Sequence, residues 1–260
     1  MENFFITEYF DWKVTRASNI DRALNVLLRW IGLRARSRTA EIFDKIVYRL
    51  TGRLFAPTRS GISTSIEQRI NMYHFVSQVM AYNVEGDIVE LGCNEGQSAV
   101  LIQKLIESFG SSKLLHLYDS FEGLPSTSAA DGTSYKEGDL ATTEDVVRRN
   151  FSRYGLRQPI IHKGWFADTI PTQLPETISF AHLDGDLYES ILVSLQYAYP
   201  RLAKGAICLI DDYCDPAVYP NGWNHLPGVK KACDEFMSDK PERLTYIYSG
   251  AFSHGFFRKL

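Results

Sequence analysis

Two pairs of aspartates carry the strongest chemical signal in the sequence. Asp184 and Asp186 follow one short apolar run, and Asp211 and Asp212 follow the next. If these runs are neighbouring parallel strands, about 4.8 Å apart, their carboxyl ends meet at one edge of a sheet. Like charges so close together need a cation, and carboxylate oxygens suit Mg²⁺. The sequence therefore predicts a magnesium site held by Asp184, Asp211 and Asp212.

Asp186 has a different predicted role. It lies two residues beyond Asp184, so in an extended segment its side chain points to the same side without having to bind the same ion. We predict that Asp186 is the general base. A helix N-cap or a solvated loop end would explain any one of these aspartates alone, but it explains the whole cluster at two strand ends less well.

A glycine loop follows an earlier apolar run, Asp87–Leu91. Its glycines, Gly92 and Gly96, allow a tight turn and a close approach to a ligand, and we expect Ser98 to open the following helix. The G-x-x-x-G spacing differs from the G-x-G-x-x-G of dinucleotide sites, and the loop lacks the lysine and Ser/Thr of a P-loop. A methionine-derived cofactor therefore fits the loop better than a dinucleotide or a triphosphate.

Asp119 supports the same cofactor. It stands at the end of the second predicted strand, where a carboxylate can accept hydrogen bonds from ribose hydroxyls. Alone, the glycine loop fits many α/β domains, and Asp119 could merely cap a helix. Together, and in this order, they favour S-adenosylmethionine. The cofactor contacts predicted from these segments are Ser65, Glu90, Gly92, Cys93, Gly96, Ser98, Asp119, Ser120 and Asp184.

The elements that position these residues follow from the hydrophobic pattern. Ser65 and Gln68 form a predicted capping box, which begins a helix that ends near Tyr82. Strands and helices then alternate, which indicates a doubly wound, mostly parallel α/β sheet with ligand sites beyond the carboxyl ends of its strands. The runs 244–248 and 255–258 predict a terminal antiparallel hairpin. The other predicted strands are 87–91, 114–118, 159–162, 178–183 and 206–210, and the other predicted helices are 99–109, 144–154, 189–202 and 228–237.

Candidate substrate contacts lie after Asp212. His225 belongs to the loop 222–227, which should face the same edge of the sheet, although a surface histidine without a role fits the sequence as well. Trp223 and Tyr213 could form a wall against an aromatic ring. We therefore predict Tyr213, Trp223 and His225 as substrate contacts.

Length and spacing indicate one catalytic domain with an appendage. The chain of 260 residues can bury one sizeable core. Turn residues at 56–61 mark a boundary, so we predict a helical appendage over residues 1–60 and a catalytic domain over residues 61–260. The run Ala23–Ile31 has the spacing of an amphipathic helix, and we expect the appendage to serve as a lid or an oligomer contact; anionic lipid is the lesser alternative.

Composition limits the partners and the compartment. A net charge of −3 gives no reason to expect nucleic acid, so the expected partner is a small hydroxylated molecule. Four scattered cysteines lack metal-site spacing and fit a reducing cytoplasm. No apolar run approaches the roughly 20 residues that span a bilayer. We expect a cytoplasmic homo-oligomer without a membrane span.

From about Ser63 to the C-terminus, the sequence resembles the macrocin O-methyltransferase family, which modifies sugars of macrolide and related antibiotics. The resemblance implies a Rossmann-like class I methyltransferase fold of seven strands, with Mg²⁺ at Asp184, Asp211 and Asp212. It also implies that Asp186 is the base and that Gly164 and Trp165 lie near the adenine. The motifs that carry it are Gly86–Glu90 with the glycine loop, Tyr118–Pro125, Lys163–Thr169, Asp184–Asp186 and Asp211–Tyr213.

The expected reaction is O-methylation of a sugar or a glycosylated natural product. The metal would bind one or two oxygens of a vicinal diol, Asp186 would remove a proton, and the oxygen would attack the sulfonium methyl in line. A catechol-like diol would be served by the same chemistry. An Asp-x-Asp motif could instead serve a metal-dependent glycosyltransferase, and a non-catalytic cofactor sensor is a further alternative. Neither explains the glycine loop, Asp119 and the carboxylate cluster together.

Overall fold

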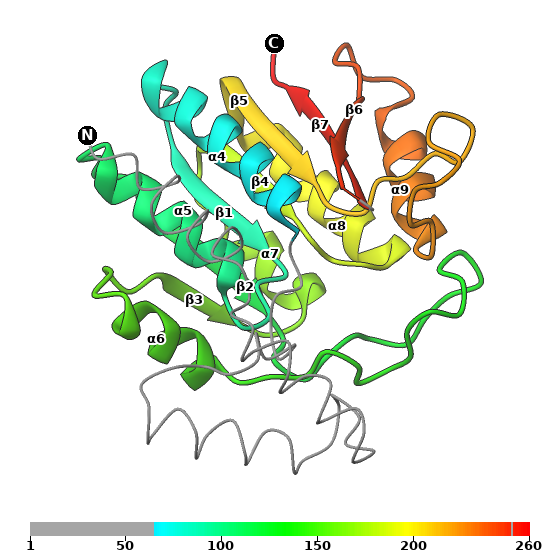
Figure 1. Cartoon of the computed structure of the whole chain (residues 1–260), viewed down its shortest axis with the longest axis horizontal. Coiled ribbons are helices and arrows are strands. Elements are labelled where there is room, and N and C mark those ends of the chain that lie inside the picture. Colours follow the sequence, from blue (N-terminus) through cyan, green and yellow to red (C-terminus); the bar gives the residue numbers. More distant parts are fainter. Residues whose placement is uncertain (1–64, 251) are drawn as a thin grey trace, which may run out of the picture. The chain divides into compact units, whose positions relative to one another are not determined.

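The computed structural model describes residues 65–250 and 252–260, all within one compact unit, Ser63–Leu260. The predicted appendage over residues 1–60 lies outside the described residues. The expected α/β architecture of the remaining chain is confirmed, since strands and helices alternate up to a final pair of antiparallel strands (Figure 1).

A seven-stranded sheet in the order β3-β2-β1-β4-β5-β7-β6 forms the centre of the fold. Strands β1 to β5 run parallel, and β7 pairs antiparallel with both β5 and β6. The strand order reverses between β1 and β4, where ligands bind in sheets of this kind. The strands are β1 (Asp87–Leu91), β2 (Leu115–Asp119), β3 (Ile160–Lys163), β4 (Ile178–Leu183), β5 (Leu202–Ile210), β6 (Thr245–Ser249) and β7 (Phe252–Arg258).

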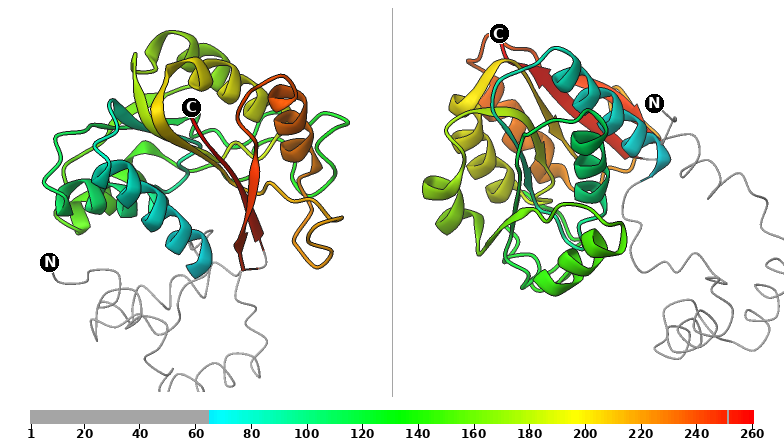
Figure 2. Two further views of the ribbon diagram at one scale, coloured as in Figure 1. Left: turned by 90° about the horizontal axis from the view of Figure 1, so that it is seen from above. Right: turned by 90° about the vertical axis from the view of Figure 1, so that its left-hand side faces the viewer.

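Helices cover both faces of the sheet, as the two further views show (Figure 2). Neighbouring helices α4 (Ile66–Ala81), α5 (Gln97–Ser108) and α6 (Glu144–Arg153) lie over one face. The other face carries α7 (Phe166–Gln173), α8 (Tyr188–Ala198) and α9 (Pro227–Met237), with a short 3-10 turn (Tyr199–Arg201) after α8. No helix within residues 65–250 or 252–260 has the length and apolarity needed to cross a membrane.

Two helix starts differ from each other in how they are capped. The predicted capping box of α4 is confirmed: Ser65 Oγ accepts from the backbone N–H of Gln68, and Gln68 Oε1 accepts from the backbone N–H of Ser65. Helix α5 begins one residue earlier than the expected opening at Ser98. Its N-cap is Gly96 at φ 76°, a left-handed conformation that favours glycine, and the side chain of Ser98 lies buried in the first turn.

The end of β1 approaches the end of β4 very closely at Gly92. Asp184 N donates to Leu91 O at 2.8 Å, and Gly92 N donates to Tyr118 O at 2.9 Å. The glycine therefore lies between the ends of the two neighbouring strands, β2 and β4. A Cβ atom at Gly92, where φ is +93°, would overlap the carbonyl oxygen of Asp184. The loop can take this path only because residue 92 has no side chain.

We expect Gly92→Ala to destabilise the protein by about 4 kcal/mol or more, because the added methyl collides with backbone atoms that cannot move aside. Gly110→Ala is the matched control: φ is +61° there, but a Cβ would meet no atom within 4 Å. The control should cost about 1–2 kcal/mol, the strain of a left-handed alanine alone. Urea denaturation measures both, and equal losses would show that the approach to Asp184 is not restrictive.

Candidate active site

A pocket of about 510 Å³ opens at the carboxyl ends of the parallel strands. The glycine loop after β1, the end of β2 and the segments after β4 and β5 all contribute to its lining, which includes Gly92, Asp119, Asp184 and Asp212. The location agrees with the expectation that ligands bind where the strand order reverses.

Asp119 fixes the glycine loop. Its Oδ2 accepts from the backbone N–H groups of Cys93 at 3.1 Å and Asn94 at 2.8 Å, and its Oδ1 accepts from Phe121 N at 2.7 Å. Burial raises the pKa of Asp119, and the three backbone donors oppose that rise. The carboxylate therefore holds the end of β2 against the loop after β1 while it lines the pocket.

The predicted cofactor contacts divide into two sets. The members that line the pocket are Gly92, Asp119, Ser120, Trp165 and Asp184. The members that do not line this pocket are Ser65, Glu90, Cys93, Gly96, Ser98 and Gly164. Gly164 N, for example, donates to Asp119 O at 2.9 Å, which positions the turn before Trp165.

Three carboxylates converge on the pocket. One oxygen from each of Asp184, Asp186 and Asp212 lies within 4.8 Å of the other two. Asp186 and Asp212 have φ values of +59° and +55°, and such backbone conformations persist where the surrounding structure enforces them. Asp212 Oδ1 is buried without a hydrogen-bond partner. Converging carboxylates with an unpartnered oxygen fit a hard divalent cation such as Mg²⁺.

The charges of this cluster are mutually unfavourable. Burial raises the pKa of Asp184 and Asp212 well above the ordinary range, and neighbouring aspartates raise both further. Burial and the negative charge of Asp211 raise the pKa of Asp186 to about 7. A bound cation would favour the ionised forms and reverse these shifts.

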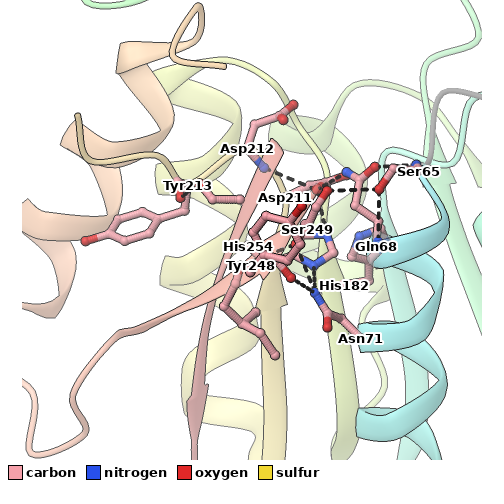
Figure 3. Close-up of polar contacts among 12 residues, drawn as sticks. Ser65, Gln68, Asn71, His182, Asp211, Asp212, Tyr213, Tyr248, Ser249 and His254 are labelled. Atoms are coloured by element: carbon pink, nitrogen blue, oxygen red, sulfur yellow. Dashed lines mark hydrogen bonds and ion pairs between the residues drawn. The ribbon is translucent and has the colours of Figure 1, made fainter. Parts of the chain in front are cut away.

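Asp211 lies in a different environment, although it also lines the pocket. Its Oδ1 accepts from Gln68 Nε2 at 2.8 Å and lies 2.7 Å from His254 Nε2 (Figure 3). Burial alone would raise the pKa of Asp211, but His254, His182 and Gln68 outweigh burial and hold it at about 2. Of the predicted ligands, Asp184 and Asp212 thus lie together with Asp186, whereas Asp211 has its own polar partners.

Glu90 is paired inside the protein core. Its Oε1 lies 2.8 Å from His182 Nδ1, and both side chains are fully buried. Burial would lower the pKa of His182, but Glu90 raises it overall. His182, Asp211 and His254 also lie close enough to share a metal. Because hydrogen bonds already occupy Asp211 Oδ1, a cation is better placed on the pocket side of the aspartates than between these two histidines.

The three predicted substrate contacts differ in their position relative to the pocket. Trp223 lines the pocket and packs against Phe252, with ring centroids 5.4 Å apart. His225 is exposed and does not line the pocket, although its ring lies 5.0 Å from that of Trp223. Tyr213 points away from Asp211 and Asp212 (Figure 3), and its hydroxyl donates to Asp234 at 2.7 Å.

The pocket also contains residues that the sequence did not single out. Tyr135 comes from the irregular segment 120–143, and burial together with the negative charges of Asp186, Asp212 and Asp184 raises its pKa to about 12. Asp131 ties this segment to α8 by accepting from Tyr188 N at 2.5 Å. No periodic pattern marks such a segment, so Tyr135 carries no signal in the sequence. Further lining residues that were not predicted as site residues include Gln68, Asn94, Leu140, Phe166 and Phe252.

Comparison with known families decides the broad class. The model of the macrocin-O-methyltransferase family (TylF) matches residues 27–237. The protein belongs to this family. It is accordingly an S-adenosylmethionine-dependent O-methyltransferase, and the family assignment removes the glycosyltransferase alternative.

Individual members of the macrocin-O-methyltransferase family and related structures agree with this assignment. The mycinamicin III 3''-O-methyltransferase of Micromonospora griseorubida is 33% identical over 62% of this chain and 68% of that protein. The 8-demethyl-8-(2,3-dimethoxy-alpha-L-rhamnosyl)-tetracenomycin-C 4'-O-methyltransferase of Streptomyces olivaceus is 34% identical over 66% of this chain and 70% of that protein. The solved O-methyltransferase NovP is 29% identical, with a TM-score of 0.66 over 78% of this chain and 84% of its own.

We expect Glu90→Ala to destabilise this O-methyltransferase by about 3–5 kcal/mol, because it leaves His182 without its partner in the core. Glu176, an exposed glutamate, provides the control, and Glu176→Ala should change stability by no more than about 0.5 kcal/mol. Guanidinium denaturation gives both values. If Glu90→Ala unfolds at the wild-type midpoint, the buried pair does not stabilise the fold.

Proposed function

We propose that this enzyme methylates a hydroxyl group of a sugar or a glycosylated natural product, with Mg²⁺ bound by Asp184, Asp211 and Asp212. The observation that carries the proposal is the convergence of Asp184, Asp186 and Asp212 on a pocket that the glycine loop and Asp119 also line. Asp211 lines the same pocket and has one carboxylate oxygen, Oδ2, to which no described residue donates.

The acceptor class is inferred from relatives and from the walls of the pocket. One relative's name specifies a rhamnosyl group and methylation at its 4' oxygen. Aromatic side chains of Tyr135, Trp165, Trp223 and Phe252 line the pocket, together with a few convergent polar groups. Such lining suits a compact ring that carries hydroxyls, since apolar surfaces bury its faces and polar groups orient it. The same walls would accept a catechol-like ring, which is the second candidate.

The residues of the chain have separate tasks in the proposed reaction. Asp119 holds the glycine loop and accepts from the ribose of the cofactor. Mg²⁺, when bound, supplies positive charge that lowers the pKa of a substrate hydroxyl beside it. Asp186 would accept the proton of that hydroxyl, and S-adenosylmethionine, when bound, would supply the methyl group to the deprotonated oxygen, with S-adenosylhomocysteine as the second product. The pocket aligns the two reactants, and alignment of this kind can supply about 7–11 kcal/mol of the barrier reduction.

The compartment and the assembly form part of the same proposal. All four cysteines lie within the described residues, and each is free and buried. Unpaired thiols fit a reducing compartment, and we therefore assign the enzyme to the cytoplasm. A homo-oligomer, with residues 1–60 as a lid or a subunit contact, remains a prediction.

Calorimetric titration with S-adenosylmethionine and S-adenosylhomocysteine, with and without Mg²⁺, tests the cofactor and the metal. Mass spectrometry of reactions with diol-bearing sugars and with phenols then tests the acceptor. We expect both cofactor forms to bind. A sugar substrate should gain about 14 mass units, because a methyl group replaces one hydrogen. Absence of cofactor binding by folded protein would overturn the proposal, and methylation of phenols alone would replace the sugar with the aromatic acceptor.

We expect Asp186→Asn to reduce turnover by about 10²–10⁴-fold, the usual contribution of a general base. Affinity for S-adenosylhomocysteine and for the metal should stay near the wild-type values, because Asp186 is not among the proposed ligands. Steady-state kinetics and Mn²⁺ titration separate the two roles. Loss of Mn²⁺ binding would identify Asp186 as a ligand instead, and retention of most of the turnover would remove it from the chemical step.

A further inference from the structure

We propose that Gln68 and His254 are positioning residues that orient Asp211 toward the bound cation. The inference rests on the proposed function, because it assumes a cation in the pocket. It adds two residues that lie far from Asp211 in the sequence, one in α4 and one in β7. Neither Gln68 nor His254 is a proposed ligand.

Three nitrogen atoms lie around a single oxygen of Asp211. Oδ1 accepts from Gln68 Nε2 at 2.8 Å and from the backbone N–H of Asp212 at 3.2 Å, and His254 Nε2 lies 2.7 Å away. Oδ2 receives no hydrogen bond from the described residues, although Asp211 lines the pocket. One oxygen is thereby held by the protein, and the other is left for the cation.

The orientation of the Gln68 amide is fixed by the capping box. Its Oε1 accepts from the backbone N–H of Ser65 at 2.6 Å, so the amide nitrogen must face Asp211. The side chain is only 2% exposed. Gln68 thus joins the start of α4 to a carboxylate at the end of β5, and a rotation of the amide would break both contacts.

The orientation of the His254 ring follows from its second neighbour. Its Nδ1 lies 3.3 Å from Asn71 Nδ2, an amide nitrogen that can only donate (Figure 3). Nδ1 is therefore the acceptor in this contact, which places Nε2 on the side of Asp211 Oδ1, 2.7 Å away. His254 is 1% exposed, which leaves the ring no water-facing alternative. Asn71 is itself held, because Nδ2 also lies 2.9 Å from Tyr248 O and from Ser249 Oγ.

This arrangement has the chemistry of a support for a metal ligand. Hydrogen-bonded partners that fix a ligating carboxylate commonly change metal affinity by about 10–100-fold when removed. Because these contacts occupy Oδ1, Oδ2 faces no competing donor among the described residues.

The test compares Mn²⁺ affinity among variants of the full chain in the presence of saturating S-adenosylhomocysteine. Mn²⁺ serves as the probe because it shares the oxygen preference of Mg²⁺ and is visible by electron paramagnetic resonance. Gln68→Leu and His254→Leu remove one donor each, and His254→Gln returns an amide donor near the position of Nε2. Ser179→Ala is the matched control: it removes a buried hydrogen bond, from Ser179 Oγ to Asp87 O, near the start of β4 and away from Asp211.

We expect both leucine variants to weaken Mn²⁺ binding by about 10–100-fold. His254→Gln should recover most of the wild-type affinity, and Ser179→Ala should retain it, while all variants keep their affinity for S-adenosylhomocysteine. Wild-type affinity for Mn²⁺ in both leucine variants, or equal weakening in Ser179→Ala, would overturn the positioning role alone. Wild-type protein that binds S-adenosylhomocysteine but no Mn²⁺ would overturn the metal in the proposed function, and this inference with it. If a leucine variant fails to fold, Mn²⁺ affinity of His254→Gln below that of Ser179→Ala by more than about tenfold contradicts the rescue and the role.

Discussion

Mutual repulsion of carboxylates at the ends of β4 and β5 is the constraint on which the rest of the site depends. Asp184, Asp186, Asp211 and Asp212 are brought to one edge because adjacent parallel strands end together. Bringing negative charges out of water and close together is costly unless each is neutralised, hydrogen-bonded or protonated. Some of the carboxylates are compensated by partners from the protein and others are not. This difference distinguishes the supporting residues from those proposed to bind the cation or act as the base.

Two of the buried carboxylates have partners supplied by the protein. Glu90 pairs with His182 inside the sheet, and Asp211 has polar partners from α4 and β7. Asp184, Asp186 and Asp212 receive no comparable compensation, and their pKa values rise in consequence. A group whose charged form is left uncompensated in a pocket is poised for a ligand. The position of the uncompensated carboxylates therefore indicates the cation site better than the number of carboxylates does.

Much of this fold was accessible from the sequence because it depends on local patterns. The strands Asp87–Leu91 and Ile178–Leu183 were predicted to the residue, and the capping box of α4 was predicted from four letters. Helix α7 was missed, since it has only eight residues and contains Pro171. Tyr213 was expected at the substrate because it follows two aspartates, but after the turn at Asp211 and Asp212 its hydroxyl donates to Asp234. Packing decides which way a side chain points at the end of a strand, and a short sequence motif does not predict that packing.

The supports of Asp211 show the same limit at longer range. Gln68 precedes the first strand of the sheet and lies 143 positions from Asp211. His254 lies in the last strand, 43 positions after Asp211 (254 − 211 = 43). The spacing of these residues along the sequence predicts no contact between them. The contacts form only because α4 packs beside the β6–β7 hairpin. His254 also lies beyond residues 27–237, the span that matches the family model. The carboxylates that define the proposed chemistry thus belong to the matched region, whereas one of the groups proposed to orient Asp211 comes from outside it.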